Sequence, residues 1–481
     1  MVTLFDWVQE HYRGLCVGLL VVWGLYRAYA QPYSMGNTTT YVTLIGAQLL
    51  LVAVFHYRKV FFLAVMVSFL WAGLSLPGKG AWGAARWPVL VCGAIVGMVL
   101  WLKEERQHFE ARHLIAMFCG LAAVTSAVVS AFPRTAFLKA MSLVILFVYA
   151  SGGARIMILN IEREFTQGLL KVCEVTTYLT AVSYFVLRAS LFGNPNSLGA
   201  VAGTVLVPVA AWGVAVADTD VLRRRRIIGL LLAVVLLLSS RGRAGLLSSL
   251  AALSFLLLSM KSYRLFLKWM TIGVAALAVV GLWAPDLIWQ SGEQVNSEVI
   301  YKGHRSNGLL GSRLEPWNAT MDTIREHPVF GGGFGTTATG AEGESEASVY
   351  ATSAGTRREH GSSYLELLEW LGLLGILPFI ALIFTILGDI RAVSRYMRST
   401  LDASHPAVPL AMICLAGLVG GVFEDWIFAV GYYLSVLFWC MAFCLADLTR
   451  RSLPSPTTAA SDLTYRGKDV GQRFREAFST R

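Results

Sequence analysis

The sequence has 481 residues, of which 56% are hydrophobic and 15% charged, and its mean hydropathy is +0.59. This composition excludes an ordinary soluble protein and predicts an all-α, polytopic integral membrane protein. The formal net charge of +10 does not indicate nucleic-acid binding, because basic residues on cytoplasmic loops of a membrane protein account for it.

Apolar segments recur along the chain at lengths near the roughly 20 residues that a helix needs to cross the hydrocarbon core. They lie near residues 14–30, 41–56, 60–77, 87–102, 113–132, 136–154, 170–187, 197–217, 227–240, 244–260, 265–284, 363–389, 407–422 and 427–446. Basic residues gather in alternate connections, such as Arg223 to Arg226, which places these connections and both termini in the cytoplasm. Termini on one side require an even number of spans, so we expect twelve or fourteen.

One long connection divides the chain. We expect an N-terminal transmembrane part at 1–284, an external loop domain at 285–361, C-terminal transmembrane helices at 362–448 and a cytoplasmic tail at 449–481. Loops longer than about 15 residues are usually functional or disordered. This one has its own pattern, because apolar residues from Leu314 to Ile324 recur at helical spacing and His327-Pro328 ends them. Such a helix is equally consistent with packing on the bundle alone.

A glycine-rich run, Gly331 to Gly335, follows this helix. Its backbone N–H groups could bind a phosphate, or the run could form a turn, and we favour the turn. We predict no metal site and no cofactor: Asp218-Thr219-Asp220 lies on the cytoplasmic side, and the external loop lacks metal-ligand spacing. The seven cysteines lie in or at predicted spans, which favours packing.

Basic groups accumulate on the predicted external side, against the usual trend. They are Arg188, Arg241, Arg243, Arg313, Arg357, Arg358 and His360. Arg241 and Arg243 flank a glycine at the tip between two short apolar segments, where they could bind a ligand or reach lipid headgroups. Several guanidinium groups together can hold a diphosphate without a metal ion, so the set indicates an anionic ligand in the membrane.

These motifs together resemble the O-antigen ligase family and its relatives, the Wzy-type polysaccharide polymerases, over about residues 185–380. The matching residues are Ser240-Arg241-Gly242, Arg313 with Trp317, His327-Pro328 with Gly331 and Gly333, His360, Tyr364-Leu365, Glu369, and Gly372 with Gly375. Where the family commonly has an asparagine after the histidine, this chain has Gly361.

The resemblance implies a glycosyltransferase C-like enzyme in the bacterial inner membrane, with its active site facing the periplasm. Its donor would be a glycan on undecaprenyl diphosphate, and its acceptor the lipid A core. A polymerase acting on another repeat unit, or a protein O-oligosaccharyltransferase, would share the same catalytic parts. A transporter of lipid-linked glycan is less consistent, because we find neither repeated halves nor polar residues through the mid-membrane.

The expected reaction is metal-independent and inverts the anomeric centre. We expect Arg188, Arg241, Arg243, Arg313 and Arg358, with Tyr364, to bind the diphosphate or glycan. His360 is the candidate general base, although an isolated histidine there could simply cap or orient the helix. Tyr364 would share its helical face if the helix began at His360, and Glu369, about 13.5 Å further along, would pair with an arginine and orient the site.

Overall fold

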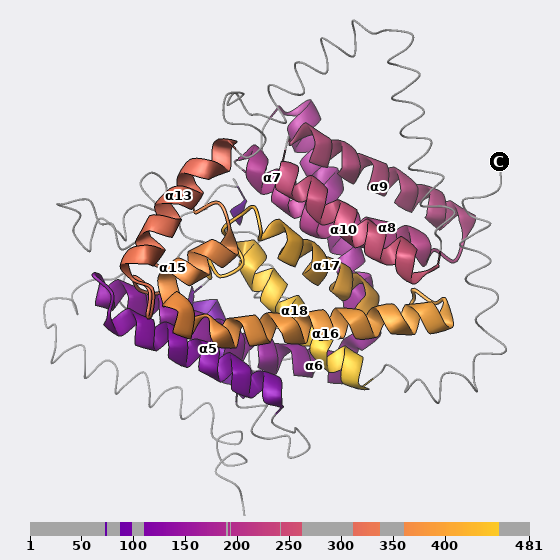
Figure 1. Ribbon diagram of the computed structural model, residues 1–481. Coiled ribbons are helices and arrows are strands. Elements are labelled where there is room, and N and C mark those ends of the chain that lie inside the picture. The colour runs from indigo at the N-terminus through magenta and orange to yellow at the C-terminus, as the bar shows by residue number, and fades with distance from the viewer. Residues whose placement is uncertain are drawn as a thin grey trace, which may run out of the picture.

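A computed structural model describes residues 73–74, 87–98, 110–188, 191–192, 194–240, 242–261, 311–336 and 360–451, with the backbone alone at 155–163, 311–315 and 451. All regular secondary structure in these ranges is helical, which confirms the all-α class for them (Figure 1). The predicted spans before residue 73 and the one at 265–284 lie outside the described residues. The total of twelve or fourteen spans therefore stays a prediction.

The helices keep the chain order of the apolar segments. They are α5 (Ala111–Val128), α6 (Pro133–Ala181), η2 (Val182–Val186), α7 (Pro195–Val201), η3 (Ala202–Leu206), α8 (Val207–Ala215), α9 (Asp220–Ser239), α10 (Arg243–Ser259), α13 (Gly311–Glu326), α15 (Ser363–Gly375), α16 (Leu377–Thr400), α17 (Ala407–Gly420) and α18 (Tyr433–Arg451). Within the described ranges, six helical segments are long and apolar enough to cross a membrane: Ala111–Val128, Pro133–Ala154, Glu164–Val186, Pro195–Ala215, Leu377–Thr400 and Tyr433–Arg450. The chain is therefore a multi-pass membrane protein.

Helices α17 and α18 form the centre of the bundle, between α16 and the group from α7 to α10 (Figure 1). In the apolar part of α18, 89% of the residues are buried, compared with 33% in α16. Large apolar side chains such as Phe118 and Phe384 point outward from the peripheral helices α5 and α16. Apolar exposure of this kind suits helices whose outer faces contact lipid rather than water.

Helix α6 departs from the predicted topology. The sequence predicted two spans joined by a cytoplasmic connection near residues 155–169, but α6 runs without interruption for 49 residues. At about 1.5 Å per residue it is about 74 Å long, more than twice the thickness of the hydrocarbon core. The two apolar halves are each long enough to cross, yet no helix end separates them.

The predicted single span at 363–389 is also wrong, because it consists of two helices. Gly372 interrupts the helical backbone with φ 64° and ψ −174°, so that α15 precedes the break and α16 follows it. A side chain would be strained at this positive φ, and its Cβ would lie 2.4 Å from the Val329 carbonyl oxygen. Only α16 is long enough to cross the membrane, whereas α15 is a short, largely buried helix.

Close backbone contact brings two of the predicted external segments together. Helices η3 and α10 pack so tightly that a Cβ on Gly203 would lie 2.1 Å from the Gly245 carbonyl oxygen. A Cβ on Gly199 would lie 2.7 Å from Ser240 Oγ and 3.1 Å from Gly242 Cα. Small residues allow helices to approach in this way inside a membrane. The turn before α7 therefore lies beside the Ser240-to-Arg243 tip.

Charged groups join α5, α16 and α18 towards the other end of the bundle. Buried Arg112 pairs with Asp389, which also accepts a hydrogen bond from Thr449 Oγ1 at 3.0 Å. Arg450 Nη1 lies 2.6 Å from Glu110 Oε2. Since α18 continues to Arg451, the tail predicted from residue 449 begins inside this helix.

Candidate active site

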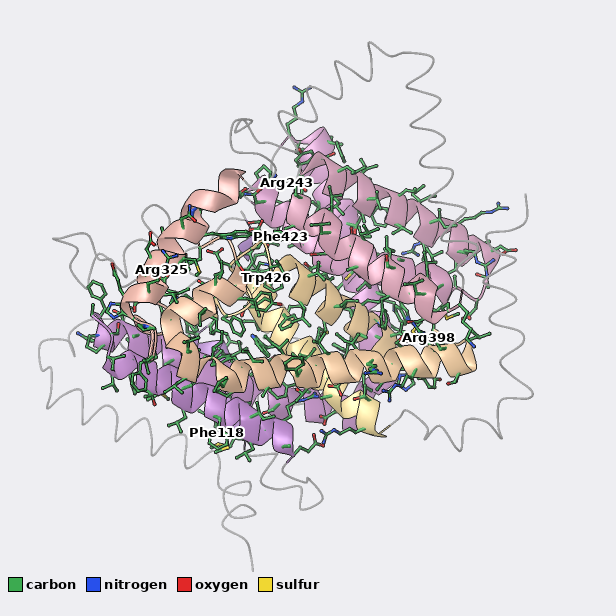
Figure 2. All side chains as sticks on the ribbon, viewed as in Figure 1. Phe118, Arg243, Arg325, Arg398, Phe423 and Trp426 are labelled. Atoms are coloured by element: carbon green, nitrogen blue, oxygen red, sulfur yellow. The ribbon has the colours of Figure 1, made fainter. Side chains whose placement is uncertain are left out.

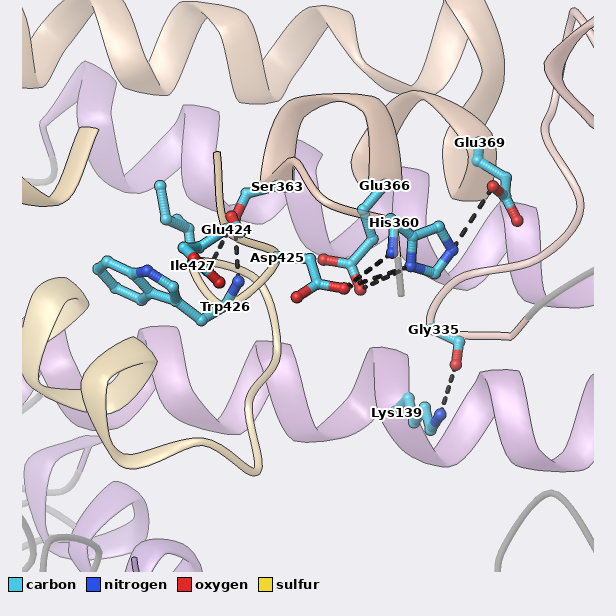
Figure 3. Close-up of polar contacts among 10 residues, drawn as sticks. All are labelled: Lys139, Gly335, His360, Ser363, Glu366, Glu369, Glu424, Asp425, Trp426 and Ile427. Carbon is cyan, nitrogen blue, oxygen red and sulfur yellow. Dashed lines mark hydrogen bonds and ion pairs between the residues drawn. The ribbon is translucent and has the colours of Figure 1, made fainter. Parts of the chain in front are cut away.

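His360 lies in a sharp turn directly before α15 (Figure 3). Gly361 has φ +65° and Ser362 is extended, so the chain folds back and places the imidazole over the first turns of the helix. The expected shared face of His360 and Tyr364 is therefore wrong, because the helix begins only at Ser363. Asparagine is one of the few residues besides glycine that adopt a positive φ, which gives a physical reason for finding either residue after the histidine.

Three carboxylates surround the His360 ring (Figure 3). Nδ1 lies 3.6 Å from Glu366 Oε1 and 3.7 Å from Asp425 Oδ2, and Nε2 lies 3.5 Å from Glu369 Oε2. The His360 backbone N–H donates to Asp425 Oδ2 at 3.0 Å. We call these four residues the His360 cluster. The separation of about 13.5 Å expected between His360 and Glu369 is wrong, because His360 lies outside the helix and turns back over it.

The His360 cluster is buried except at Asp425. The side chain of His360 is 1% exposed and those of Glu366 and Glu369 are 0%, whereas the Asp425 side chain is 24% exposed. Trp370 packs against one side of the cluster. Its ring centroid lies 6.0 Å from that of the imidazole, and the two rings are nearly perpendicular. Charge buried this deeply is costly unless it is compensated within the cluster.

The carboxylates control the protonation of His360. Burial alone would lower its pKa, but the contacts with Asp425 and Glu369 and the charges of Glu366 and Glu369 outweigh this and raise the pKa from 6.5 to about 9. The imidazole therefore carries a positive charge in most molecules at neutral pH. One cation then faces three acidic groups, which stabilise its charge.

Asp425 was not predicted as a site residue. It lies in the connection between α17 and α18, which Ser363 ties to the start of α15. Ser363 Oγ donates to the Glu424 carbonyl oxygen at 2.7 Å and accepts from the backbone N–H groups of Trp426 and Ile427 at 3.0 and 3.1 Å. The available signal was an acidic pair between two apolar segments, in a connection that the predicted topology places outside.

The glycine-rich run is an ordered clamp on α15. The N–H groups of Gly332 and Gly333 donate to the carbonyl oxygens of Glu369 and Trp370 at 2.9 and 3.2 Å. Those of Leu373 and Leu374 donate back to Pro328 and Val329 at 2.8 and 3.2 Å. The run is thus the turn that we favoured, and the N–H groups of Gly332 and Gly333 are occupied. Its main effect is to fix the part of α15 that carries Glu369.

Two aromatic residues attach this region to its neighbours. Trp317 Nε1 of α13 donates to the Gly361 carbonyl oxygen at 3.2 Å, so the loop helix packs on the turn that holds His360. The Tyr364 hydroxyl donates to the Leu418 carbonyl oxygen of α17 at 2.7 Å. In this structure Tyr364 therefore anchors α15 to the bundle. His327 is exposed just after α13.

The predicted arginines that the structure describes differ in position and in exposure. Arg243 begins α10 and lies, half-buried, at the same end of the bundle as Phe423 and Trp426 (Figure 2). This agrees with the contact between α10 and α17, where a Cβ on Gly420 would lie 2.6 Å from Ser248 Oγ. Arg188 is exposed and has a left-handed φ of 52°. Arg241, Arg357, Arg358 and the side chain of Arg313 lie outside the described residues.

Potential metal ligands meet in the His360 cluster, although the sequence contained no metal-ligand spacing. Atoms of His360, Glu366 and Asp425 lie within 4.8 Å of one another. An imidazole and two carboxylates could hold a divalent cation as well as a proton. The spacing could not be seen in the sequence because Asp425 is 65 residues from His360.

Comparison with known proteins places the central part of this site in one family. Residues 228–380 match the family model described as O-antigen ligase, a segment that contains the Ser240-to-Arg243 tip, the glycine clamp, His360, Glu366 and Glu369. No curated protein matches the chain. Proteins of the matched family are glycosyltransferase-like ligases and polymerases. The chain therefore carries a domain of the O-antigen ligase family at residues 228–380.

Proposed function

We propose that this protein is an O-antigen ligase of the bacterial inner membrane. It transfers O-antigen polysaccharide from undecaprenyl diphosphate to the lipid A core at the periplasmic face. The observation that supports this most strongly is the His360 cluster, a buried imidazole among three carboxylates within the family-matched segment. It lies where several predicted external segments meet, beside the connection between α17 and α18.

The proposed reaction is a single displacement. An acceptor sugar hydroxyl attacks the anomeric carbon, the bond from that carbon to the diphosphate oxygen breaks, and undecaprenyl diphosphate leaves with the electron pair. Attack opposite the leaving group inverts the anomeric centre. Arginines, among them Arg243 at this end of the bundle, would neutralise the departing diphosphate, since charges aimed at a developing anion are often the largest catalytic contribution.

The hydroxyl proton needs an acceptor, and we assign this function to His360 together with its carboxylates. The three carboxylates, 3.5 to 3.7 Å from the ring nitrogens, would stabilise the imidazolium that forms when His360 accepts the proton. General base catalysis of this kind typically contributes about 100-fold to 10,000-fold. Glu369, held by the glycine clamp, orients the imidazole through Nε2 and is proposed to act as a positioning residue.

A polymerase is the second candidate, because the matched family includes both ligase-type and polymerase-type enzymes. It would use the same donor and the same His360 cluster but extend another lipid-linked repeat unit. The two functions differ in the acceptor, which is the lipid A core for the ligase and a lipid-linked repeat unit for the polymerase.

The test is to express the protein and His360→Ala in a strain that lacks its own ligase, and to analyse lipopolysaccharide by gel electrophoresis. We expect capped lipopolysaccharide with the unchanged protein and uncapped core with His360→Ala, at equal protein levels. The control is His405→Ala, a histidine whose Nδ1 accepts the Ala407 N–H before α17, and it should cap normally. Normal capping by His360→Ala would overturn the assignment of His360, and a ladder limited to one repeat with ligation intact would favour the polymerase.

A further inference from the structure

An apolar groove opens on the outer surface of the bundle, between α5, α15 and α16. Its volume is about 570 Å³, within the range of about 300–1,000 Å³ that is typical of sites for small organic ligands. Its lining includes Phe118 and Leu121 of α5, Leu371 and Leu374 of α15, and Leu377 of α16. Helices α5 and α16 pack beside each other along this face (Figure 1). The groove is therefore large enough to hold a ligand rather than only water.

The groove offers apolar contacts and no charge. None of its lining residues in the described part of the chain is charged, and its two hydroxyl groups already donate within the protein. Thr125 Oγ1 donates to the Leu121 carbonyl oxygen at 2.9 Å, and Ser126 Oγ donates to that of Trp370. A diphosphate or a sugar needs polar partners that this lining does not supply, whereas a hydrocarbon chain needs none.

The groove is continuous with the surface that contacts lipid. Phe118, Leu121, Leu374 and Leu377 are 50 to 60% exposed, and all four belong to its lining. The outer faces of α5 and α16 suit contact with lipid, so a hydrocarbon chain can enter the groove sideways from the bilayer. The position of the groove therefore selects the chain of a lipid as its ligand.

Helix α15 joins the groove to the His360 cluster. Leu371 lines the groove and directly follows Trp370, whose ring centroid lies 6.0 Å from that of the His360 imidazole. Phe330, which also lines the groove, directly precedes the glycine clamp that fixes Glu369. A lipid whose chain lies in the groove is thus held beside the helix that carries the site.

The proposed displacement requires its two substrates to approach from different directions, because the diphosphate leaves opposite to the attacking hydroxyl. Arg243, one of the cations proposed to neutralise the diphosphate, lies on one side of Trp426, and Phe118 of the groove lies on the other (Figure 2). With the donor on the Arg243 side, the groove lies on the side that is left for the acceptor.

We propose, on the basis of the proposed function, that this groove binds an acyl chain of the lipid A part of the acceptor. The chain lies between α5 and α16 and against Leu371 and Leu374 of α15. The core oligosaccharide then extends past α15 to the His360 cluster, where its hydroxyl attacks the donor. Binding the chain holds the acceptor in the membrane at a fixed distance from the site, which favours the reaction through proximity.

The first test fills the groove with a larger side chain in the purified full-length protein. Leu121→Trp places an indole in the groove, and Leu231→Trp on α9 is the matched control, because these leucines are 60% and 59% exposed and Leu231 does not line the groove. We expect Leu121→Trp to raise the KM for the lipid A core about tenfold or more, with the donor KM and kcat within a few-fold. The control should change none of these values. An unchanged acceptor KM in Leu121→Trp would overturn the proposal.

The second test removes the acyl chains from the acceptor instead. For the unchanged protein, deacylated lipid A core should have a KM about tenfold or more above that of the intact acceptor. In Leu121→Trp, deacylation should add little, because the chain has already lost its place. If deacylation raised the KM by the same factor in both proteins, the two changes would be independent. The groove would then not bind the chain, and Leu121→Trp would be a merely structural defect.

Photochemical cross-linking identifies what occupies the groove. With benzoylphenylalanine in place of Phe118, we expect mass spectrometry to find a cross-link to an acyl chain of added lipid A core, and excess intact acceptor to compete with a labelled one. A cross-link only to the donor chain or to membrane phospholipid would overturn the proposal. So would a cross-link to the predicted spans at 14–77 of the same chain, because they would then fill the groove.

These outcomes separate the inference from the proposed function. If the unchanged protein transfers no glycan to the lipid A core, the proposed function fails and the inference fails with it. If it does so with equal KM for the intact and the deacylated acceptor, only the inference is wrong.

Discussion

Two groups of buried charges lie at different ends of the same bundle, and they are built differently. Arg112 meets Asp389, and Thr449 completes the contact, so one cation faces one carboxylate. His360 meets three carboxylates, one of which is 24% exposed. In the first group the charges are balanced and largely buried. In the second group the carboxylates outnumber the imidazole, and Asp425 is partly exposed.

This difference distinguishes a structural ion pair from a candidate functional site. A balanced pair compensates its own burial and joins the helices that carry it, here α5, α16 and α18. Buried acidic groups in excess around one imidazole are costly for stability and are typical of functional sites, so the His360 cluster is the candidate site. The comparison predicts that damage at one end changes stability and that damage at the other changes chemistry.

The largest effect on stability is expected for Arg112→Met, which leaves Asp389 buried without its cation. Removing one partner of a buried ion pair typically costs about 3–5 kcal/mol. Thermal unfolding in detergent should show this loss, while the transfer rate per folded molecule stays within a few-fold. Arg112→Met combined with Asp389→Leu should recover much of the stability, and a double variant no better than the single one would contradict the pairing.

A smaller loss is expected for Gly372→Ala at the break between α15 and α16. A non-glycine residue at φ 64° is strained, and its Cβ would lie 2.4 Å from the Val329 carbonyl oxygen. Strain of this kind costs about 1–3 kcal/mol. Because the clamp positions Glu369, the transfer rate should fall as well.

Gly388→Ala in α16 is the matched control, since a Cβ there has no neighbour within 4 Å. It should leave both stability and rate unchanged. Equal effects of the two substitutions would remove the argument for a specific clamp at Gly372.

Stability should also depend on pH. The folded-state pKa of His360 is raised from 6.5 to about 9, so its stabilising contribution is complete below about 6.5 and disappears as the pH rises through about 9. The melting temperature of the unchanged protein should therefore fall towards that of His360→Gln between pH 6.5 and 9. A difference between them that does not change over this range would show that His360 is not held as a cation.

Hydropathy alone predicted the apolar helices of the C-terminal half well. Helices α10, α17 and α18 lie close to the segments expected at 244–260, 407–422 and 427–446. The length of an apolar segment is a local property of the sequence, so it predicts the position of a helix without knowledge of tertiary contacts. The break at Gly372 could not be predicted in the same way, because it is completed by hydrogen bonds to residues 328–333, some 40 positions earlier.

Local motifs identified His360 and Glu369 but not how they meet. Their contact depends on the reversal at Gly361, and the sequence suggested a continuous helix instead. Asp425 was missed because no short pattern joins it to His360, and only the attachment of Ser363 to the following connection brings them together. The functions of the arginines stay predictions.

The most direct test of the central claim is a single-turnover assay of glycan transfer from undecaprenyl diphosphate to the lipid A core. It compares purified His360→Gln and Arg112→Met with the unchanged protein at equal folded concentration. We predict that His360→Gln lowers the rate by about 100-fold to 10,000-fold and that Arg112→Met keeps it within a few-fold. A His360→Gln enzyme that transfers glycan at nearly the original rate would contradict the assignment of this cluster as the active site.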